Sequence, residues 1–328
     1  MDDPMMTPAR RVVKECMGIR KDELLTIIVD GSTMKIGENL FNAGIEVGAE
    51  TLILRMKKGE RHGQEPPSIV EEAMAASDAV IAPTAFSLSH TQARKRACLG
   101  GTRVATMPMI TNDMFMGKAL DIDHKVMARR IRDLHEKLRG RTVARIRTEL
   151  GTDLEMRIDH GRWVRDDGML QERGSFGNLP AGELFCAPLE GTANGTLVVD
   201  GSMAGIGALD EPLVLHIENG LLTSAEGEIG EKLLNMLDPA GRRGAENGLE
   251  TGSSRNVAEL GIGANEGASI SGNPLEDEKV LGTVHVALGD SSTFGGLVRA
   301  GIHLDGIVKE ATLTFGDLVV IDHGRPLF

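Results

Sequence analysis

The segment Leu24-Leu25-Thr26-Ile27-Ile28-Val29 consists almost entirely of apolar residues and ends at Asp30-Gly31-Ser32, the pattern of a fully buried strand followed by a turn. A helical stretch at residues 34–47 and a strand at residues 50–56 follow, at the length that a right-handed parallel crossover requires. The alternation continues with helices at residues 69–76 and 91–99 and strands at residues 78–83 and 102–108. This order predicts an open parallel sheet flanked by helices.

A change of pattern follows a charged amphipathic helix at residues 121–139, which ends at Gly140. Beyond it come short strands with frequent glycine, a hairpin signal at Asn219-Gly220, one helix at residues 230–237, and a polar segment at residues 238–251 that we expect to be an exposed loop. The sequence therefore predicts two domains. Residues 1–140 form an α/β open-sheet domain, and residues 141–328 form a larger, antiparallel β-rich, barrel-like domain with a few helices that carries the metal and the catalysis.

The composition favours an acidic cytoplasmic enzyme. Of the 328 residues, 26% are charged and the net charge is −12, which argues against a nucleic-acid partner because phosphate binding requires a basic surface. Three widely separated cysteines fit neither a disulfide framework nor a CxxC metal site. The first twenty residues lack an apolar signal segment, and no run is long enough to span a membrane. We expect a cytoplasmic protein that acts on a small peptide or another small molecule.

Two strand-like segments near the end of the chain carry metal-ligand residue types. His303 and Asp305 alternate with Ile302 and Leu304, so both would project from the same face of an extended strand. His285 lies in an apolar run, where a buried imidazole needs a hydrogen-bond or metal partner. Two imidazoles and one carboxylate form a minimal metal-ligand set, of the kind found in hydrolytic zinc or cobalt sites and in non-haem iron oxygenases.

Two glutamates in apolar segments extend this set. Glu183 opens the run at residues 183–188, and Glu259 lies inside a nearly continuous apolar run, where an unpaired carboxylate would be costly. Taken singly, the candidates have structural alternatives, such as a solvated strand end for Glu183 and a core histidine bonded to a backbone carbonyl for His285. Together with His285, His303 and Asp305, the two glutamates favour one common site.

Other polar residues are weaker candidates. Glu190 is a rival of Glu183, and residues 276–278 form an acidic run that we interpret as a solvated turn, with one member reaching a metal as the lesser alternative. Ser89 and His90 precede a helix, where we expect Ser89 to cap the helix and His90 to lie at the surface, with anion binding as the alternative.

Several motifs resemble those of the aminopeptidase T-like family of metallo-aminopeptidases, also called thermophilic metalloproteases. They occur in the family's order and are Asn178-Leu179-Pro180-Ala181-Gly182-Glu183, Ala258-Glu259-Leu260-Gly261-Ile262-Gly263, Gly282-Thr283-Val284-His285-Val286-Ala287-Leu288-Gly289 and His303-Leu304-Asp305. The resemblance implies a hydrolase with a two-metal centre (zinc, cobalt or manganese) whose ligands are Glu183, Glu259, His285, His303 and Asp305. It also implies a homodimer that encloses the active-site cavity.

On this hypothesis the metals activate water at neutral pH. Glu183 and Glu259 serve as catalytic carboxylates, and Glu183 carries the proton to the leaving amine. The chain departs from the family pattern at the tyrosine that follows the third motif, because residues 290–294 read Asp-Ser-Ser-Thr-Phe and the chain contains no tyrosine. Ser292 or another donor would have to take the place of that tyrosine.

The same region also resembles the ring-cleaving 2,5-dihydroxypyridine dioxygenases, which bind one Fe(II) through two histidines and one aspartate. His285, His303 and Asp305 would supply that triad. The sequence therefore predicts a metal-dependent aminopeptidase or related amide hydrolase, with a mononuclear Fe(II) dioxygenase and a non-catalytic metal-binding module as alternatives.

Overall fold

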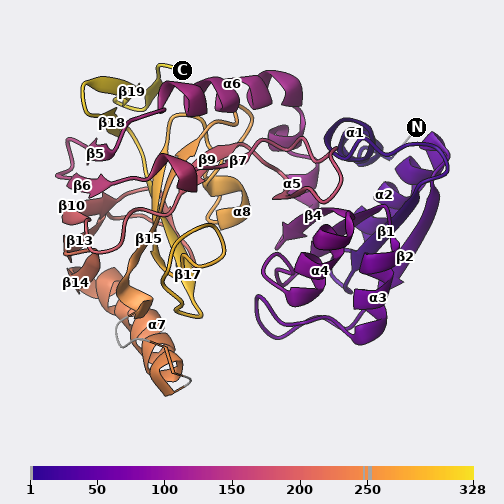
Figure 1. The fold of residues 1–328 in the computed structure, drawn as a ribbon, viewed down its shortest axis with the longest axis horizontal. Coiled ribbons are helices and arrows are strands. Elements are labelled where there is room, and N and C mark those ends of the chain that lie inside the picture. The colour runs from indigo at the N-terminus through magenta and orange to yellow at the C-terminus, as the bar shows by residue number, and fades with distance from the viewer. Residues whose placement is uncertain (1–2, 247, 250–252) are drawn as a thin grey trace. The chain divides into compact units, whose positions relative to one another are not determined.

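A computed structural model describes residues 3–246, 248–249 and 253–328 (Figure 1). Contacts divide the chain into two compact units, of which the first is Met1–Ala128 with Asp166–Ala181, and the second is Arg129–Arg165 with Gly182–Phe328. These units differ from the predicted domains. The predicted boundary after Gly140 puts Asp166–Ala181 in the second domain, whereas the contacts put this segment in the first unit. None of the helices in the described residues is long and apolar enough to span a membrane.

The first unit is built on a parallel sheet of five strands in the order β2-β1-β3-β4-β8. Its elements are α1 (Met6–Arg11), a π-helical turn (Val12–Cys16), β1 (Leu24–Val29), α2 (Met34–Val47), β2 (Glu50–Arg55), α3 (Ser68–Ala76), β3 (Ala79–Thr84), α4 (Gln92–Gly100), β4 (Arg103–Pro108), α5 (Asn112–Phe115), a 3₁₀ turn (Lys118–Leu120) and β8 (Phe176–Asn178). The predicted strands and helices are confirmed to within a few residues. Strand β8 was not predicted.

Helices cover both faces of this sheet because β1 is apolar on both sides. Ile28 packs in a buried cluster with Val70 of α3 and Ala93 of α4. On the other face, a Cβ atom at Gly37 of α2 would lie 2.4 Å from Cγ1 of Val29, so glycine permits the close approach of α2 to β1. A continuous apolar strand of this kind is typical of a sheet that is buried on both faces.

The second unit contains two antiparallel sheets. Its elements are α6 (His124–Lys137), which begins in the first unit, and then β5 (Val143–Arg147), β6 (Asp153–Arg157), a 3₁₀ turn (His160–Arg162), β7 (Val164–Asp166), β9 (Glu183–Cys186), β10 (Asn194–Val199), β11 (Ser202–Met203), β12 (Gly207–Ala208), β13 (Leu213–Glu218), β14 (Leu221–Ala225), α7 (Gly227–Glu246), a 3₁₀ turn (Ser253–Arg255), β15 (Val257–Gly263), α8 (Pro274–Asp277), β16 (Val284–Gly289), β17 (His303–Val308), β18 (Thr312–Phe315), β19 (Leu318–Asp322) and β20 (Arg325–Pro326).

The strand order is β14-β13-β10-β6-β5-β18-β19-β20 in the larger sheet and β12-β11-β17-β16-β15-β9-β7 in the smaller one. The sheets pack closely where β17 meets β10, since a Cβ atom at Gly306 would lie 2.8 Å from Cγ2 of Val199. The β-rich prediction is confirmed. The pairing within the described residues gives two separate sheets and does not confirm a barrel.

The turn between β13 and β14 has the predicted hairpin geometry, with φ of 51° at Asn219 and 77° at Gly220. The expected exposed loop at residues 238–251 is wrong for its first part, because α7 continues to Glu246 with Pro239 inside it. Buried Leu233, Leu237 and Ala240 anchor this helix, which contacts β13 and β14. Residues 247 and 250–251 of the expected loop lie outside the described residues.

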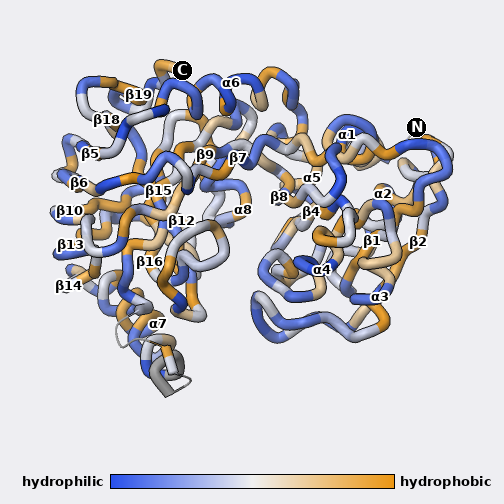
Figure 2. Tube along the Cα trace, viewed as in Figure 1, coloured by the Kyte–Doolittle hydropathy of each residue, from blue (hydrophilic) through white to orange (hydrophobic). Residues whose placement is uncertain are grey.

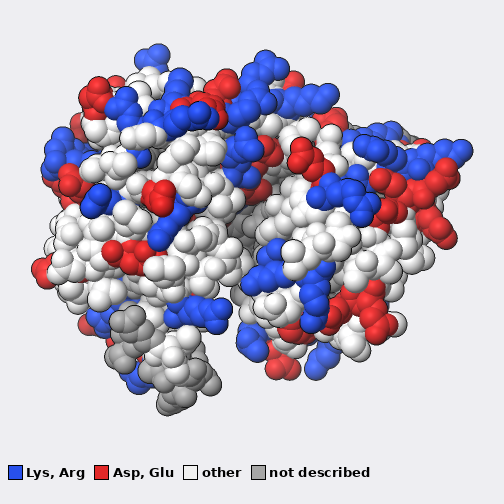
Figure 3. Space-filling view, viewed as in Figure 1, with Lys and Arg blue, Asp and Glu red and all other residues white. Residues whose placement is uncertain are grey.

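The face of the molecule that is visible in Figure 3 carries charges of both signs. Figure 2 shows α6 largely in the hydrophilic colour, and Figure 3 shows basic and acidic side chains interspersed on the visible face. Ion pairs join some of them, such as Arg145 and Asp153, whose closest atoms are 2.7 Å apart.

Candidate metal centre

The five predicted ligand residues lie on four neighbouring strands of the smaller sheet, β17, β16, β15 and β9. Glu183 begins β9, Glu259 lies on β15, His285 on β16, and His303 and Asp305 on β17. The register pairs Glu259 with Ala287 and Ala287 with Asp305, and it pairs Gly261 with His285. Glu183 is paired with Gly263 and His303 with Gly289, and because side chains alternate along a strand, this register turns all five toward the same face.

The side chains meet in two groups that share Glu259. In the first group, Nε2 of His285 lies 3.2 Å from Oε2 of Glu183 and 3.3 Å from Oε1 of Glu259. In the second group, Nε2 of His303 lies 3.4 Å from Oε2 of Glu259 and 3.4 Å from Oδ1 of Asp305. Within each group, one donor atom from each of the three residues lies within 4.8 Å of the others, a spacing that one metal ion can bridge.

A glycine creates the space for the first imidazole. A Cβ atom at Gly261 would lie 1.8 Å from Nε2 of His285, far inside any permitted contact. Gly261 is the register partner of His285 on β15, and its backbone lies directly beneath the ring. The sequence motif therefore needs glycine at position 261, because the His285 side chain from the adjacent strand β16 fills the space that a Cβ atom would take.

The centre is buried and strongly acidic. Burial acts to lower the pKa of His285, but the adjacent Glu183 and Glu259 carboxylates outweigh it and raise the pKa to about 10. Burial likewise acts to lower the pKa of His303, and Asp305 with Glu259 raises it well above its ordinary value. The carboxylates therefore favour positive charge at the position where the imidazoles converge.

A divalent metal ion is the cofactor that these donors fit. Oε2 of Glu183 and Oδ1 of Asp305 are buried and have no hydrogen bond of good geometry among the described residues, and each faces an imidazole, so a cation held between imidazole and carboxylate would satisfy them. Imidazole nitrogen and carboxylate oxygen are ligands of zinc, manganese, cobalt and iron.

The ring of His303 is already oriented for metal binding. Its Nδ1 lies 2.7 Å from the backbone oxygen of Asp290 and donates a hydrogen bond to it, so Nε2, which faces Glu259 and Asp305, is the nitrogen that can bind a metal. A hydrogen bond of this kind fixes the tautomer of a metal-binding histidine. His303 is the most accessible of the five, with 28% of its side chain exposed, so the centre opens on the β17 side.

Lys279 and Glu278 also belong to the centre, and the sequence analysis missed Lys279. The interpretation of residues 276–278 as a solvated turn is wrong, because Glu276 and Asp277 are buried and the Lys279 side chain is 0% exposed. Nζ of Lys279 lies 2.5 Å from Oε1 of Glu183 and 3.0 Å from Oε2 of Glu278. No local pattern distinguishes this lysine from a surface lysine that follows an acidic run.

An aromatic ring lies beside His303, in the segment where the aminopeptidase pattern has a tyrosine. Phe294 packs edge-to-face against His303, with ring centroids 5.7 Å apart, and against Phe185 at 5.5 Å. Ser292 does not replace the tyrosine, because its hydroxyl donates to Oδ1 of Asp290 at 2.7 Å.

Two weaker candidates have structural roles. Glu190 accepts hydrogen bonds from Arg162 and from the backbone N–H of Leu297, so it anchors the segment between β16 and β17. Ser89 is buried and hydrogen-bonded to the Thr106 hydroxyl at 2.8 Å, and Thr91 caps α4 in its place. The prediction that Ser89 caps this helix is therefore wrong.

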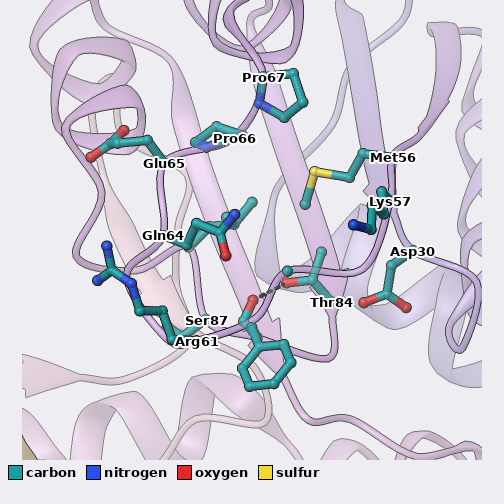
Figure 4. Close-up of a pocket in the computed structure, with 13 residues that line it drawn as sticks. Asp30, Met56, Lys57, Arg61, Gln64, Glu65, Pro66, Pro67, Thr84 and Ser87 are labelled. Carbon is teal, nitrogen blue, oxygen red and sulfur yellow. Dashed lines mark hydrogen bonds between the residues drawn. The ribbon is translucent and has the colours of Figure 1, made fainter.

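A small pocket in the first unit lies at the carboxyl ends of β1, β2 and β3 (Figure 4). Asp30, Lys57, Arg61 and Thr84 contribute to its lining, at a position where α/β sheets commonly bind ligands. Its volume of about 30 Å³ accommodates about two water molecules, which is too small for an aromatic substrate.

The family profile named NicX, 2,5-dihydroxypyridine 5,6-dioxygenase, matches residues 5–327. The chain belongs to this dioxygenase family. A solved structure of 2,5-dihydroxypyridine dioxygenase from Pseudomonas putida KT2440 is similar at a TM-score of 0.83 and 17% identity, covering 100% of this chain and 98% of that chain. AmpT from Thermus thermophilus is similar at a TM-score of 0.72 and 15% identity, covering 99% of each chain. No curated protein sequence matches the chain.

Both families that the sequence resembles thus recur among these similarities. At such identities the two structures show a shared fold. The dioxygenase family match favours the dioxygenase hypothesis over the aminopeptidase hypothesis, which reverses the order that the sequence motifs gave.

Proposed function

We propose that this protein is a mononuclear Fe(II) dioxygenase that cleaves the ring of a dihydroxylated nitrogen heteroaromatic compound. The observation that carries the proposal is the position of His285, His303 and Asp305 on one face of the adjacent strands β16 and β17, in a chain matched over residues 5–327 by the dioxygenase family. Two histidines and one carboxylate are the ligand set of many non-haem iron oxygenases.

In this proposal, Nε2 of His285, Nε2 of His303 and a carboxylate oxygen of Asp305 hold the ion. A ferrous ion in such a set supplies the redox chemistry that activates dioxygen and leaves positions open for substrate. The hydrogen bond from Nδ1 of His303 to the backbone of Asp290 keeps Nε2 available as a ligand.

Glu183 and Glu259 supply acid–base groups beside this triad. Oε2 of Glu183 has no hydrogen-bond partner among the described residues and lies 3.2 Å from His285. A substrate hydroxyl that enters the centre must lose a proton to become a strong ligand, and Oε2 of Glu183 is placed to accept it. Glu259 lies between the two imidazoles and compensates positive charge there.

The aromatic rings near His303 suit an aromatic substrate. Phe185, Phe294 and His303 form a chain of edge-to-face contacts on the more accessible side of the centre. Because aromatic pairs prefer edge-to-face or offset stacked contacts, a flat heteroaromatic ring gains specific packing at this wall.

The test is oxygen uptake by protein loaded with Fe(II) under anaerobic conditions and then mixed with 2,5-dihydroxypyridine and dissolved oxygen. We expect equimolar consumption of oxygen and substrate, together with loss of the ring absorbance. His303→Ala should abolish both, whereas His323→Ala, which changes an exposed histidine, should abolish neither. Absence of oxygen uptake with a panel of dihydroxylated pyridines and benzenes would contradict the proposal.

A metal-dependent aminopeptidase or related amide hydrolase remains the second candidate. It is supported by the two three-residue groups that share Glu259, which offer positions for two ions, and by the similarity in fold to AmpT. It predicts hydrolysis of aminoacyl amides by protein loaded with zinc, cobalt or manganese. The resemblance to aminopeptidase T-like proteins also leads us to propose a homodimer, which light scattering of the purified protein would test.

A further inference from the structure

Lys279 brings a fully buried ammonium group into this centre. Its side chain is 0% exposed, and its ammonium group contacts Glu183 at 2.5 Å and Glu278 at 3.0 Å. A lysine is fully buried at this depth only when its charge is compensated, and these carboxylates compensate it. The ammonium satisfies Oε1 of Glu183. Glu183 is also one of the three residues that would hold an ion in the first group, so a two-metal centre depends on it.

The backbone around Lys279 holds the side chain in place. Asp277, two residues earlier, accepts hydrogen bonds from the Ser202 hydroxyl at 2.6 Å and from the backbone N–H groups of Ser271 and Gly272 at 2.7 and 2.9 Å. The N–H of Lys279 itself donates to the backbone oxygen of Glu276 at 2.9 Å. The lysine therefore enters the centre from a turn that is anchored on several sides.

The two three-residue groups of the cluster differ in the positive charge that each already contains. The first group, Glu183 with Glu259 and His285, already contains the ammonium at Glu183. In the second group, Glu259 with His303 and Asp305, Oδ1 of Asp305 has no hydrogen-bond partner among the described residues. A divalent ion in the first group would share the Glu183 carboxylate with the ammonium, and the repulsion between these like charges in a buried site opposes its binding.

We propose that Lys279 takes the place of a second metal ion and thereby limits the centre to one ion per chain, the ion that His285, His303 and Asp305 hold in the proposed function. This inference rests on the proposed function because it concerns the ion of the same centre. It assigns Lys279 as a positioning residue, which keeps Glu183 out of the metal-ligand set and available as a proton acceptor.

The experiment is a titration of metal-free protein with Mn(II), a redox-stable probe, with bound ions counted by electron paramagnetic resonance and by elemental analysis. We expect one Mn(II) per chain for the wild type and for Lys309→Ala, which removes a partly exposed lysine of the same unit. We expect two per chain for Lys279→Ala, with the spectrum of a spin-coupled pair. Lys279→Arg, which keeps the charge, should restore a single ion.

Two ions in the wild type, or one ion in folded Lys279→Ala, would overturn the inference. If Lys279→Ala is not recovered as folded protein, Lys279→Gln replaces it, since it removes the charge and keeps a polar head group. The count in the wild type can refute the inference whatever the variants do. A wild type that holds one Mn(II) but, when loaded with Fe(II), consumes no oxygen contradicts the proposed function and leaves the role of Lys279 intact.

Discussion

Replacement of Gly261 by alanine should disable the metal centre with only a moderate loss of stability. The new Cβ atom would lie 1.8 Å from Nε2 of His285, and the contact must open to at least 3.0 Å, so the ring or its strand must move by 3.0 − 1.8 = 1.2 Å. Metal–ligand distances tolerate only about 0.2 Å. Mutations that misorient a ligand typically reduce metal affinity by about 10- to 100-fold, and we expect at least that loss.

The stability cost follows from overpacking, which is about 1–3 kcal/mol for an added carbon in a well-packed interior. The assays are Mn(II) affinity by calorimetric titration and the free energy of unfolding of metal-free protein in urea. Gly100→Ala is the matched control, because nothing lies within 4 Å of its new Cβ atom at the end of α4. It should leave the Mn(II) affinity unchanged.

A double-mutant cycle tests whether Gly261 acts through His285. If it does, the variant with both Gly261→Ala and His285→Ala should bind Mn(II) no more weakly than His285→Ala alone. Wild-type Mn(II) affinity in Gly261→Ala would refute the reasoning that the backbone of β15 sets the position of this imidazole.

Three further predictions concern other parts of the molecule. Removal of the metal by a chelator should lower the midpoint of thermal unfolding, because an ion present at 100 times its Kd stabilises the fold by about 2.7 kcal/mol. Re-addition of Fe(II) or Mn(II) should reverse the shift. An unchanged midpoint would contradict metal binding by the folded centre. Phe294→Ala should raise KM for a dihydroxypyridine by roughly 2- to 13-fold, from the loss of an aromatic contact of about 0.5–1.5 kcal/mol, while the Mn(II) count per chain stays the same; an unchanged KM would exclude Phe294 from the substrate wall. Asp30→Asn should destabilise the protein at pH 7 by about 1 kcal/mol in urea unfolding. Burial acts to raise the pKa of Asp30, but hydrogen bonds from Ser32 and Ala85 outweigh it and lower the pKa. The contribution of the Asp30 carboxylate to stability is therefore present above the unfolded pKa of about 3.9 and is lost as the pH falls toward the folded pKa. The difference between variant and wild type should therefore shrink below about pH 4, and a difference that grows there would contradict the assignment.

Tertiary packing overrode local signals at three places. Pro239 and the polar residues around it indicate a loop, yet α7 runs through them because Leu233, Leu237 and Ala240 are buried on one face. Ser89 lies at the expected helix start but is hydrogen-bonded to Thr106, on a strand that only the folded sheet brings near it. Lys279 follows acidic residues like a surface lysine, and its burial depends on Glu183, which is 96 positions earlier in the chain.

The sequence by itself determined the features that depend on neighbours along the chain. The apolar run of β1 and the alternation of strands and helices predict the parallel sheet, Asn219-Gly220 predicts the hairpin, and the period of two along β17 places His303 and Asp305 on the same face. These features follow from backbone geometry and local preference. Only the tertiary structure decided that Glu183, Glu259 and His285 join that face and that Lys279 already occupies one end of the cluster. The register between strands distant in sequence sets these contacts, and register is fixed by the packing of the whole sheet.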